Sequence, residues 1–333
     1  MSLTLGIETS CDDTAVAVLE GEHRVLSELL SSQIKDHARF GGVVPEFAAR
    51  RHMETLLPLV DAVLSEAGVR GPDLGLIAVT CGPGLMGSLI VGVQAARALS
   101  QAWGVPLIGV NHLEGHLFAP LIEEPGLRPP FLSLIVSGGH TEILRVDAPG
   151  RYALLGATRD DAAGEAYDKA AKVLGLPYPG GPEVDRLARE GNPRAFDFPV
   201  PLKNTRVIEF SFSGLKTALL WQVRRLEEAG VNPLPVADLC ASFQRAVTEA
   251  LVAKVALAVR LTGIRTVAAS GGVAANSALR AALKRPGKWR TFVPSPGRCT
   301  DNAVMIAMAG RSAWDRGQRS PADLTPDPSL TIG

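Results

Sequence analysis

Two stretches of the sequence share one pattern, in which an apolar run, a short turn of small or polar residues and a second apolar run follow one another. The first is LTLGIETSCDDTAVAVL, which starts at residue 3, and the second is FLSLIVSGGHTEILRV, which starts at residue 131. Each stretch predicts a β-hairpin, the first with its turn at Thr9 to Thr14. Because each hairpin opens one part of the chain, we expect an internally duplicated α/β protein.

Length and composition agree with a duplicated globular protein. The chain has 333 residues, more than one hydrophobic core normally serves, so we expect two domains. Hydrophobic residues make up 46% and charged residues 20%, which excludes an intrinsically disordered chain. Lys and Arg number 34, as do Asp and Glu. A protein of zero net charge that handles a nucleic acid does so through local patches or with partners.

The cysteines and the apolar segments indicate in which cellular compartment the protein is expected. The four cysteines form no C-x-x-C pair, which is typical of a reducing cytosol. The N-terminus shows no signal peptide. Leu74 to Ala96 carries no charge and is long enough to span a membrane, but Gly82 to Gly84 interrupts it. We therefore expect a buried α/β core segment and no membrane association.

Strand and helix patterns alternate along the chain, which is typical of an α/β fold. The tail beyond residue 316 is rich in Pro and Asp, and we expect it to be loosely held. Between the hairpins and the tail, the pattern predicts strands at 25–33, 76–80, 106–110, 266–270 and 291–294, and helices at 46–57, 58–67, 86–103, 161–174, 183–190, 213–228, 238–261 and 303–316.

The stretch NHLEGH places His112 and His116 four positions apart. In a helix the two side chains leave the same face one turn apart, where two imidazoles can bind one metal ion. The alternative is that both are ordinary residues of a helix face. Glu114 lies about 200° around the helix from the pair. A metallopeptidase needs its glutamate directly after the first histidine, so the spacing argues against peptidase activity.

A metal site at these histidines needs a further ligand, and Asp301 is the candidate. It lies just before a predicted helix, where a carboxylate also makes a favourable N-cap, so capping alone is the alternative. Two imidazoles and one carboxylate leave coordination positions open, which suits a catalytic ion that contacts substrate. The spacing does not encode which metal is bound.

Three turns in the second part of the chain carry glycines: Ser137 to Gly139, Gly180 to Gly181, and Gly271 to Gly272. Such backbone can approach a ligand closely, and its N–H groups bind anions, although each could be an ordinary turn. No P-loop pattern is present. A polar residue accompanies each turn, and together they predict a nucleotide-like ligand: Asp168, Asp185 and Asn276.

Two of the carboxylates have competing interpretations. Asp12, in the first hairpin turn, could position or deprotonate a nucleophile, or could bond only to its own backbone. Asp168 shares a helical face with Asp161, Glu165 and Lys172, which is commonly a solvated face. It could instead bind a ribose hydroxyl.

Nine short motifs occur in order from residue 5 to about residue 310. They are GIETSCDDT, FGGVVPE, GPGLMGSL, NHLEGH, LIVSGGHTE, DDAAGEAYDKAAKVLGLPYPGGP, FSFSGLKTA, SGGVAANS and CTDNAVMIA. Together they resemble the TsaD/Kae1 family, whose members are tRNA N6-adenosine threonylcarbamoyltransferases, formerly labelled O-sialoglycoprotein endopeptidases. The resemblance implies the duplicated actin-like (ASKHA, ribonuclease H-like) fold, with two lobes, a cleft between them and a final helix that packs back onto the first lobe.

The resemblance also implies a reaction. Threonylcarbamoyl-AMP, a mixed anhydride made by a separate synthase, gives its threonylcarbamoyl group to N6 of adenosine 37 in tRNAs that read codons beginning with A, and AMP leaves. Bacterial relatives work in the cytoplasm with a paralogous inactive ASKHA subunit (TsaB-like) and a small P-loop ATPase (TsaE-like). Many of them end in a basic, Trp-containing segment, from which the tail SPADLTPDPSLTIG departs.

The family's functional positions can be carried over onto this sequence. They imply a first lobe of residues 1–118 with 302–333, and a second lobe of residues 119–301 with an insert at 191–212. The implied metal is Fe(2+), with zinc possible in purified protein, and its ligands are His112, His116 and Asp301. The implied adenylate-binding residues are Ile135, Val136, Ser137, Gly138, Gly139, Asp168, Gly181, Asp185 and Asn276.

Three other functions compete with the transferase. A metal-dependent peptidase is the historical label, and an ASKHA-type phosphotransferase is what the fold alone would suggest. A non-catalytic scaffold is the third, and it is disfavoured because the two histidines, Asp301 and the three glycine turns are all intact.

Overall fold

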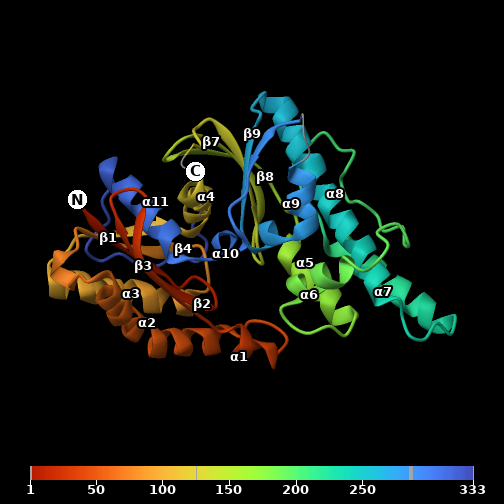
Figure 1. Cartoon of the computed structure of the whole chain (residues 1–333), viewed down its shortest axis with the longest axis horizontal. Coiled ribbons are helices and arrows are strands. Elements are labelled where there is room, and N and C mark those ends of the chain that lie inside the picture. Colours follow the sequence, from red (N-terminus) through yellow and green to blue (C-terminus); the bar gives the residue numbers. More distant parts are fainter. Residues whose placement is uncertain (1, 125, 285–287, 333) are drawn as a thin grey trace. The chain divides into compact units, whose positions relative to one another are not determined.

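A computed structural model describes residues 2–124, 126–284 and 288–332 of the chain (Figure 1). The chain forms two compact units: unit 1 comprises residues 1–126 and 301–333, and unit 2 comprises residues 127–300. The expected boundary after residue 118 falls inside the helix His112–Glu123, which lies wholly in unit 1. That each unit is an independent domain stays a prediction.

Unit 1 contains one five-stranded sheet and the helices that cover it. Its elements are β1 (Leu3–Glu8), β2 (Asp13–Glu20), β3 (Arg24–Ser32), α1 (Ile34–Ala38), α2 (Pro45–Ala67), the 3-10 helix η1 (Gly71–Asp73), β4 (Leu76–Gly82), α3 (Met86–Trp103), β5 (Leu107–Asn111), α4 (His112–Glu123) and α11 (Ala303–Asp315).

Unit 2 contains a second five-stranded sheet with its own helices. Its elements are β6 (Phe131–Val136), β7 (Thr141–Ala148), β8 (Arg151–Ala157), α5 (Ala163–Val173), α6 (Gly180–Ala188), α7 (Ser213–Glu228), α8 (Val236–Thr262), β9 (Thr266–Ser270), the 3-10 helix η2 (Gly272–Ala275), α9 (Ser277–Leu283), β10 (Arg290–Phe292) and α10 (Pro296–Cys299).

The two sheets have the same topology. Their strand orders are β3-β2-β1-β4-β5 and β8-β7-β6-β9-β10. In each, the first three strands in sequence pair antiparallel as a meander, and the last two are parallel to the first. The hairpins that open both units are β1–β2 and β6–β7. The predicted internal duplication of an α/β fold is therefore confirmed.

Some predicted elements differ from the structure. The helices expected at 46–57 and 58–67 form the single helix α2, which accommodates Pro58 in its interior. The helix expected from residue 183 begins earlier, at Gly180. The tail is not loosely held, because Leu324 is buried in the core of unit 1 and the Asp327 N–H donates to the Cys81 carbonyl at 2.8 Å.

The final helix α11 packs against the sheet of unit 1, as the family resemblance implied. It contacts β1, β2, β4 and β5. Gly6 permits the closest approach, because a Cβ at that position would lie 2.2 Å from the Ala303 carbonyl oxygen. The residues of α11 from Ala303 to Ala309 are almost fully buried. Such close packing explains why a segment from the end of the chain belongs to unit 1.

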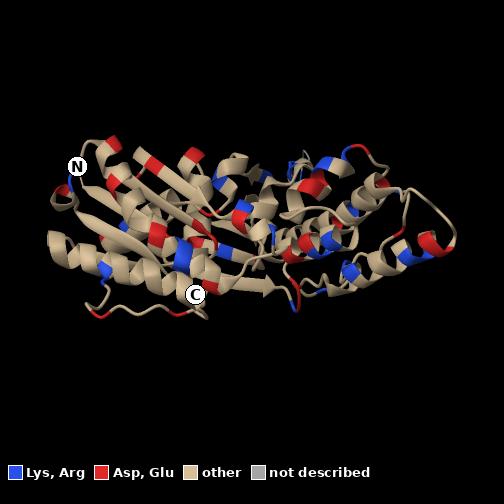
Figure 2. Cartoon of the chain, turned by 90° about the horizontal axis from the view of Figure 1, so that it is seen from below, with Lys and Arg blue, Asp and Glu red and all other residues tan. Residues whose placement is uncertain are grey.

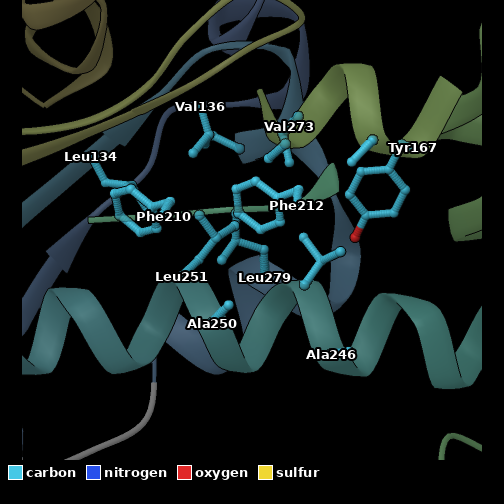
Figure 3. Packing of buried hydrophobic residues seen from close by; sticks show 14 of the residues in the cluster. Leu134, Val136, Tyr167, Phe210, Phe212, Ala246, Ala250, Leu251, Val273 and Leu279 are labelled. Atoms are coloured by element: carbon cyan, nitrogen blue, oxygen red, sulfur yellow. The ribbon is translucent and has the colours of Figure 1, made fainter. Parts of the chain in front are cut away.

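The core of unit 2 is built around aromatic rings (Figure 3). Phe210 and Phe212 stack with their ring centroids 6.3 Å apart, and Tyr167 meets Phe243 edge-on. The first two end the stretch 191–212, which contains no named helix or strand. Buried aromatic side chains therefore anchor this expected insert to the sheet.

The charges are mixed in sign over the view in Figure 2, as the equal counts of basic and acidic residues suggest. Among the described residues, no helix combines the length and the apolar character needed to span a membrane. The apolar stretch from Leu74 to Ala96 is instead the buried strand β4 followed by α3.

Candidate functional site

The helix α4 places both histidines at its start. The side chain of Asn111 caps the helix, accepting from the backbone N–H groups of Leu113 at 2.8 Å and Glu114 at 3.3 Å. This cap satisfies orphan donors of the first turn and fixes where the helix begins. His112 and His116 therefore leave one face, as predicted, and both are buried.

Asp301 meets the two histidines within unit 1. Its Oδ1 lies 3.2 Å from His116 Nε2 and 3.6 Å from His112 Nε2. The candidate ligand atoms of the three residues lie within 4.8 Å of one another. Capping alone does not account for Asp301, because the N-cap of α11 is Asn302, which accepts from the Met305 N–H at 3.0 Å.

The environment of His116 fits a metal ion. Its side chain is fully buried, and neither ring nitrogen makes a hydrogen bond in the described structure, although Nε2 faces the Asp301 carboxylate at 3.2 Å. A buried polar group without a partner costs about 1–3 kcal/mol. Ligands about 2.1 Å from a cation lie about 3–3.4 Å apart, close to the spacing between Asp301 and the two imidazoles. A divalent cation would bond to the orphaned imidazole and offset the carboxylate charge.

Sequence reasoning missed Glu8, which lies behind His112. Its Oε2 is 2.9 Å from His112 Nδ1 and accepts from Thr80 Oγ1 at 2.6 Å. Burial alone would lower the pKa of His112, but the charges of Glu8 and Asp301 raise it to about 9. Burial alone would raise the pKa of Glu8, but His112 lowers it. The sequence does contain one signal for Glu8, because it is the single carboxylate at the end of the apolar strand β1.

Glu114 points away from the cluster. Its Oε1 lies 3.3 Å from the Arg316 guanidinium, at the end of α11. A peptidase of the H-E-x-x-H type needs its glutamate beside the metal-bound water. The structure therefore agrees with the sequence spacing in arguing against that activity.

The β1–β2 turn carries Asp12 and is held by side chains from two helices. His52 Nε2 (α2) and Ser88 Oγ (α3) both donate to the Cys11 carbonyl, each at 3.0 Å. Burial and the neighbouring Asp12 raise the pKa of the Cys11 thiol well above its usual value, so this thiol is not an activated nucleophile. The turn is a rigid support for Asp12.

In unit 2 the β6–β7 turn is open. The Ser137 N–H donates to the His140 carbonyl at 2.8 Å, and the His140 N–H donates to Ser137 Oγ at 3.1 Å. A Cβ on Gly138 or Gly139 would meet no atom within 4 Å, and the same holds for Gly181 in α6. There is therefore open space beside these three glycines, and the contact of a ligand with their backbone stays a prediction.

Other glycines let neighbouring elements close around this turn. Gly271 has φ +89°, and a Cβ there would lie 2.2 Å from the Val136 carbonyl oxygen. A Cβ on Gly164, in the first turn of α5, would lie 2.7 Å from the Ser137 carbonyl oxygen. Val136 and its predecessor Ile135 lie in β6, beside β7 and β9. Of the expected glycine turns, the one at Gly271 thus packs against the end of β6, and Gly164, which was not expected, packs against the β6–β7 turn.

The three polar residues expected beside these turns hold the turns in place. Asp168 Oδ1 accepts from the Gly180 N–H at 2.7 Å. Asp185 is buried and accepts from Ser277 Oγ at 2.7 Å. Asn276 caps α9 by accepting from the Leu279 N–H at 3.0 Å. The structure thus gives each a supporting role, and their contact with an adenylate stays a prediction.

Comparison with known proteins decides the family. The profile of the family described as tRNA N6-adenosine threonylcarbamoyltransferase matches residues 24–308. The chain belongs to the tRNA N6-adenosine threonylcarbamoyltransferase family. A relative of that name from Anaeromyxobacter sp. (strain Fw109-5) is 53% identical over 98% of this chain and 99% of its own length. Another, from Dictyoglomus turgidum, is 49% identical over 99% of both.

As a member of this threonylcarbamoyltransferase family, the chain is an enzyme of tRNA modification that forms threonylcarbamoyladenosine. The fold agrees with the expected actin-like class. The (R)-2-hydroxyglutaryl-CoA dehydratase component A of Acidaminococcus fermentans superposes with a TM-score of 0.57, covering 93% of this chain and 98% of the other at 15% identity. Such low identity supports the fold alone.

Proposed function

We propose that this transferase uses threonylcarbamoyl-AMP as donor and N6 of adenosine 37 of tRNAs reading codons that begin with A as acceptor, and that it releases AMP. The observation that carries the proposal is the cluster of two buried histidines, His112 and His116, with the partly exposed Asp301, in which the His116 imidazole makes no hydrogen bond. Family membership supplies the tRNA adenosine as substrate.

At the carbamoyl carbon, the transfer forms one bond and breaks one. N6 attacks the carbamoyl carbon, the bond from that carbon to the phosphate oxygen breaks, N6 loses a proton, and AMP leaves with the electron pair. Because a mixed anhydride has a good leaving group, orienting the weak amine is the main catalytic demand. We assign Asp12 to this task, as the group that positions the amine or accepts its proton, supported by its place in the rigid β1–β2 turn.

His112, His116 and Asp301 would hold one divalent ion per chain. Bound there, the ion supplies Lewis acidity and a template for the threonylcarbamoyl group. Two imidazoles and one carboxylate form the ligand set typical of non-haem Fe(II), so we propose Fe(2+), with zinc able to replace it in purified protein.

The open glycine backbone of unit 2 would hold the adenylate. Its N–H groups suit a phosphate, and the accessible face at Gly138, Gly139 and Gly181 leaves room for one. The proposed binding set keeps Ile135 to Gly139, Asp168, Gly181, Asp185 and Asn276.

The enzyme would act in the cytoplasm with other proteins. We propose a paralogous inactive ASKHA subunit and a small P-loop ATPase as its partners. The zero net charge of this chain supports the idea that such an assembly shares the tRNA-binding surface.

The test is a reconstituted modification assay. Purified protein, its partners and a donor synthase are incubated with tRNA, threonine, bicarbonate and ATP. The tRNA is then digested, and its nucleosides are quantified by mass spectrometry. We expect threonylcarbamoyladenosine from the wild type and from His23→Ala, an exposed-histidine control, and at least about a 100-fold lower yield from His112→Ala/His116→Ala. Equal yield from the double variant would contradict the role of the cluster.

A further inference from the structure

Glu8 is a fully buried carboxylate to which the proposed reaction assigns no role. Three donors surround it: the Ser10 N–H on Oε1, and Thr80 Oγ1 at 2.6 Å with His112 Nδ1 at 2.9 Å on Oε2. A buried carboxylate is costly unless it is paired and hydrogen-bonded. A residue kept in such a position has a specific task.

The geometry of the His112 ring shows what that task is. Its Nδ1 lies 2.9 Å from Glu8 Oε2 and 3.2 Å from Ser10 Oγ, whereas its Nε2 lies on the side of Asp301, at 3.6 Å. The shorter contact is the one to the carboxylate. A carboxylate only accepts hydrogen bonds, so Nδ1 has to carry the proton that it donates. Nε2 is then the nitrogen whose lone pair can bind a metal.

The second histidine is held differently. In the described structure, neither ring nitrogen of His116 makes a hydrogen bond, and Nε2 only faces the Asp301 carboxylate at 3.2 Å. No group behind the His116 ring therefore orients it as Glu8 orients His112.

We propose that Glu8 is a positioning residue for the metal: it holds His112 in the tautomer and orientation that present Nε2 to the ion. This inference rests on the metal site of the proposed function. Carboxylates behind a ligating imidazole fix ring orientation and raise ligand basicity, and losing one typically weakens metal binding 10–100-fold.

Glu8→Gln tests the tautomer directly. The amide nitrogen of the introduced glutamine cannot face the Ser10 N–H, because two donors would then oppose each other. It must face Thr80 and His112, which can each turn from donor to acceptor. His112 Nδ1 then accepts, the ring proton moves to Nε2, and the metal-binding lone pair is lost while the side-chain volume is kept.

The experiment measures Zn(2+) affinity by chelator competition on the full chain. We expect Glu8→Gln to bind Zn(2+) about 10–100-fold more weakly than the wild type. The matched control is Thr80→Val, which removes the other donor from the same carboxylate oxygen without changing His112, and which should stay within about threefold. A folded Glu8→Gln with wild-type affinity would overturn the proposal.

A second measurement covers the case in which Glu8→Gln fails to fold. Nitrogen-15 NMR of the Zn(2+)-loaded wild type should show His112 protonated at Nδ1, and protonation elsewhere would overturn the role of Glu8. A wild type that binds no Zn(2+), or a His116→Ala variant that binds it equally well, would instead overturn the metal site itself, and with it the task of Glu8.

Discussion

The two units repeat one sheet topology but differ at the turn of the opening hairpin. In unit 1 the β1–β2 turn carries carboxylates and is fixed by His52 and Ser88. In unit 2 the β6–β7 turn carries Gly138 and Gly139, which face open space. The same backbone plan thus presents charged side chains at the turn in one unit and glycines with open space beside them in the other.

The segments after the last parallel strand differ as well. In unit 1, β5 leads directly into α4, a twelve-residue helix whose first residue is His112. In unit 2, β10 is followed by α10, which has four residues and no histidine. The two copies of the duplicated scaffold therefore differ at the loops and helix ends, where function commonly resides: one copy carries the histidine and carboxylate cluster, and the other carries glycine turns.

The largest effect should come from removing a metal ligand. Asp301→Ala should lose its bound metal and lower the rate of threonylcarbamoyladenosine formation by at least about 100-fold, because two imidazoles alone hold a cation poorly. Metal content by elemental analysis and nucleoside yield measure this. A unit 2 variant such as Gly138→Val should keep its metal. If both variants lost it, the division of tasks between the units would be wrong.

A close backbone approach in unit 2 gives the next effect, on stability. Gly271→Ala places a Cβ at a left-handed φ and 2.2 Å from the Val136 carbonyl oxygen. The strain and the displacement of β6 should lower the free energy of unfolding by about 2–4 kcal/mol. Urea unfolding measures this, with Gly139→Ala as the control expected to change stability by less than about 0.5 kcal/mol. Equal losses would show that the turn is packed rather than open.

Gly138→Val should affect binding rather than folding. The new side chain has room, but it occupies the space in which a ligand would contact the backbone. We expect the affinity for AMP, measured calorimetrically, to fall about tenfold, with an unfolding midpoint close to that of the wild type. Unchanged AMP affinity would remove the β6–β7 turn from the nucleotide site.

The last effect is a pH dependence of stability that arises in the β1–β2 turn region of unit 1. Burial raises the pKa of Asp13 to about 7, with help from Asp12 and despite a hydrogen bond from Ser32. The folded state thus holds this proton more tightly than the unfolded chain, so its contribution to stability is complete below about pH 4 and is lost as pH rises toward 7.

Asp13→Asn has no such proton to lose. Between pH 5 and pH 8, metal-free Asp13→Asn should gain about 2 kcal/mol of stability relative to the wild type. Urea unfolding in the presence of a chelator measures the difference. A difference between the two proteins that does not change with pH would show that Asp13 titrates normally.

Much of this arrangement follows from local sequence patterns. The helix 86–103 and the duplicated hairpins were predictable because their apolar periodicity and glycine turns are local signals. The position of Asp301 before a predicted helix made it a candidate third ligand, but local patterns could not exclude simple capping, because Asp301 lies far from the histidines in the sequence.

Other features depend on tertiary packing. The only local signal for Glu8 is a carboxylate at the end of an apolar strand, and its role depends on Thr80 and His112 from two other elements. The strand β8 was missed because its half-exposed residues show no clean alternation. The tail is held in place by hydrogen bonds to groups that are far away in the sequence, such as the Cys81 carbonyl.

The central claim is that unit 1 binds one divalent ion through His112, His116 and Asp301. Crystals of the protein reconstituted with Fe(2+) or Zn(2+), measured on both sides of the metal absorption edge, test it most directly. We expect one anomalous peak per chain, about 2.0–2.2 Å from Nε2 of each histidine and from a carboxylate oxygen of Asp301. A peak that lies elsewhere, or a fully loaded protein with no peak among these three residues, would contradict it.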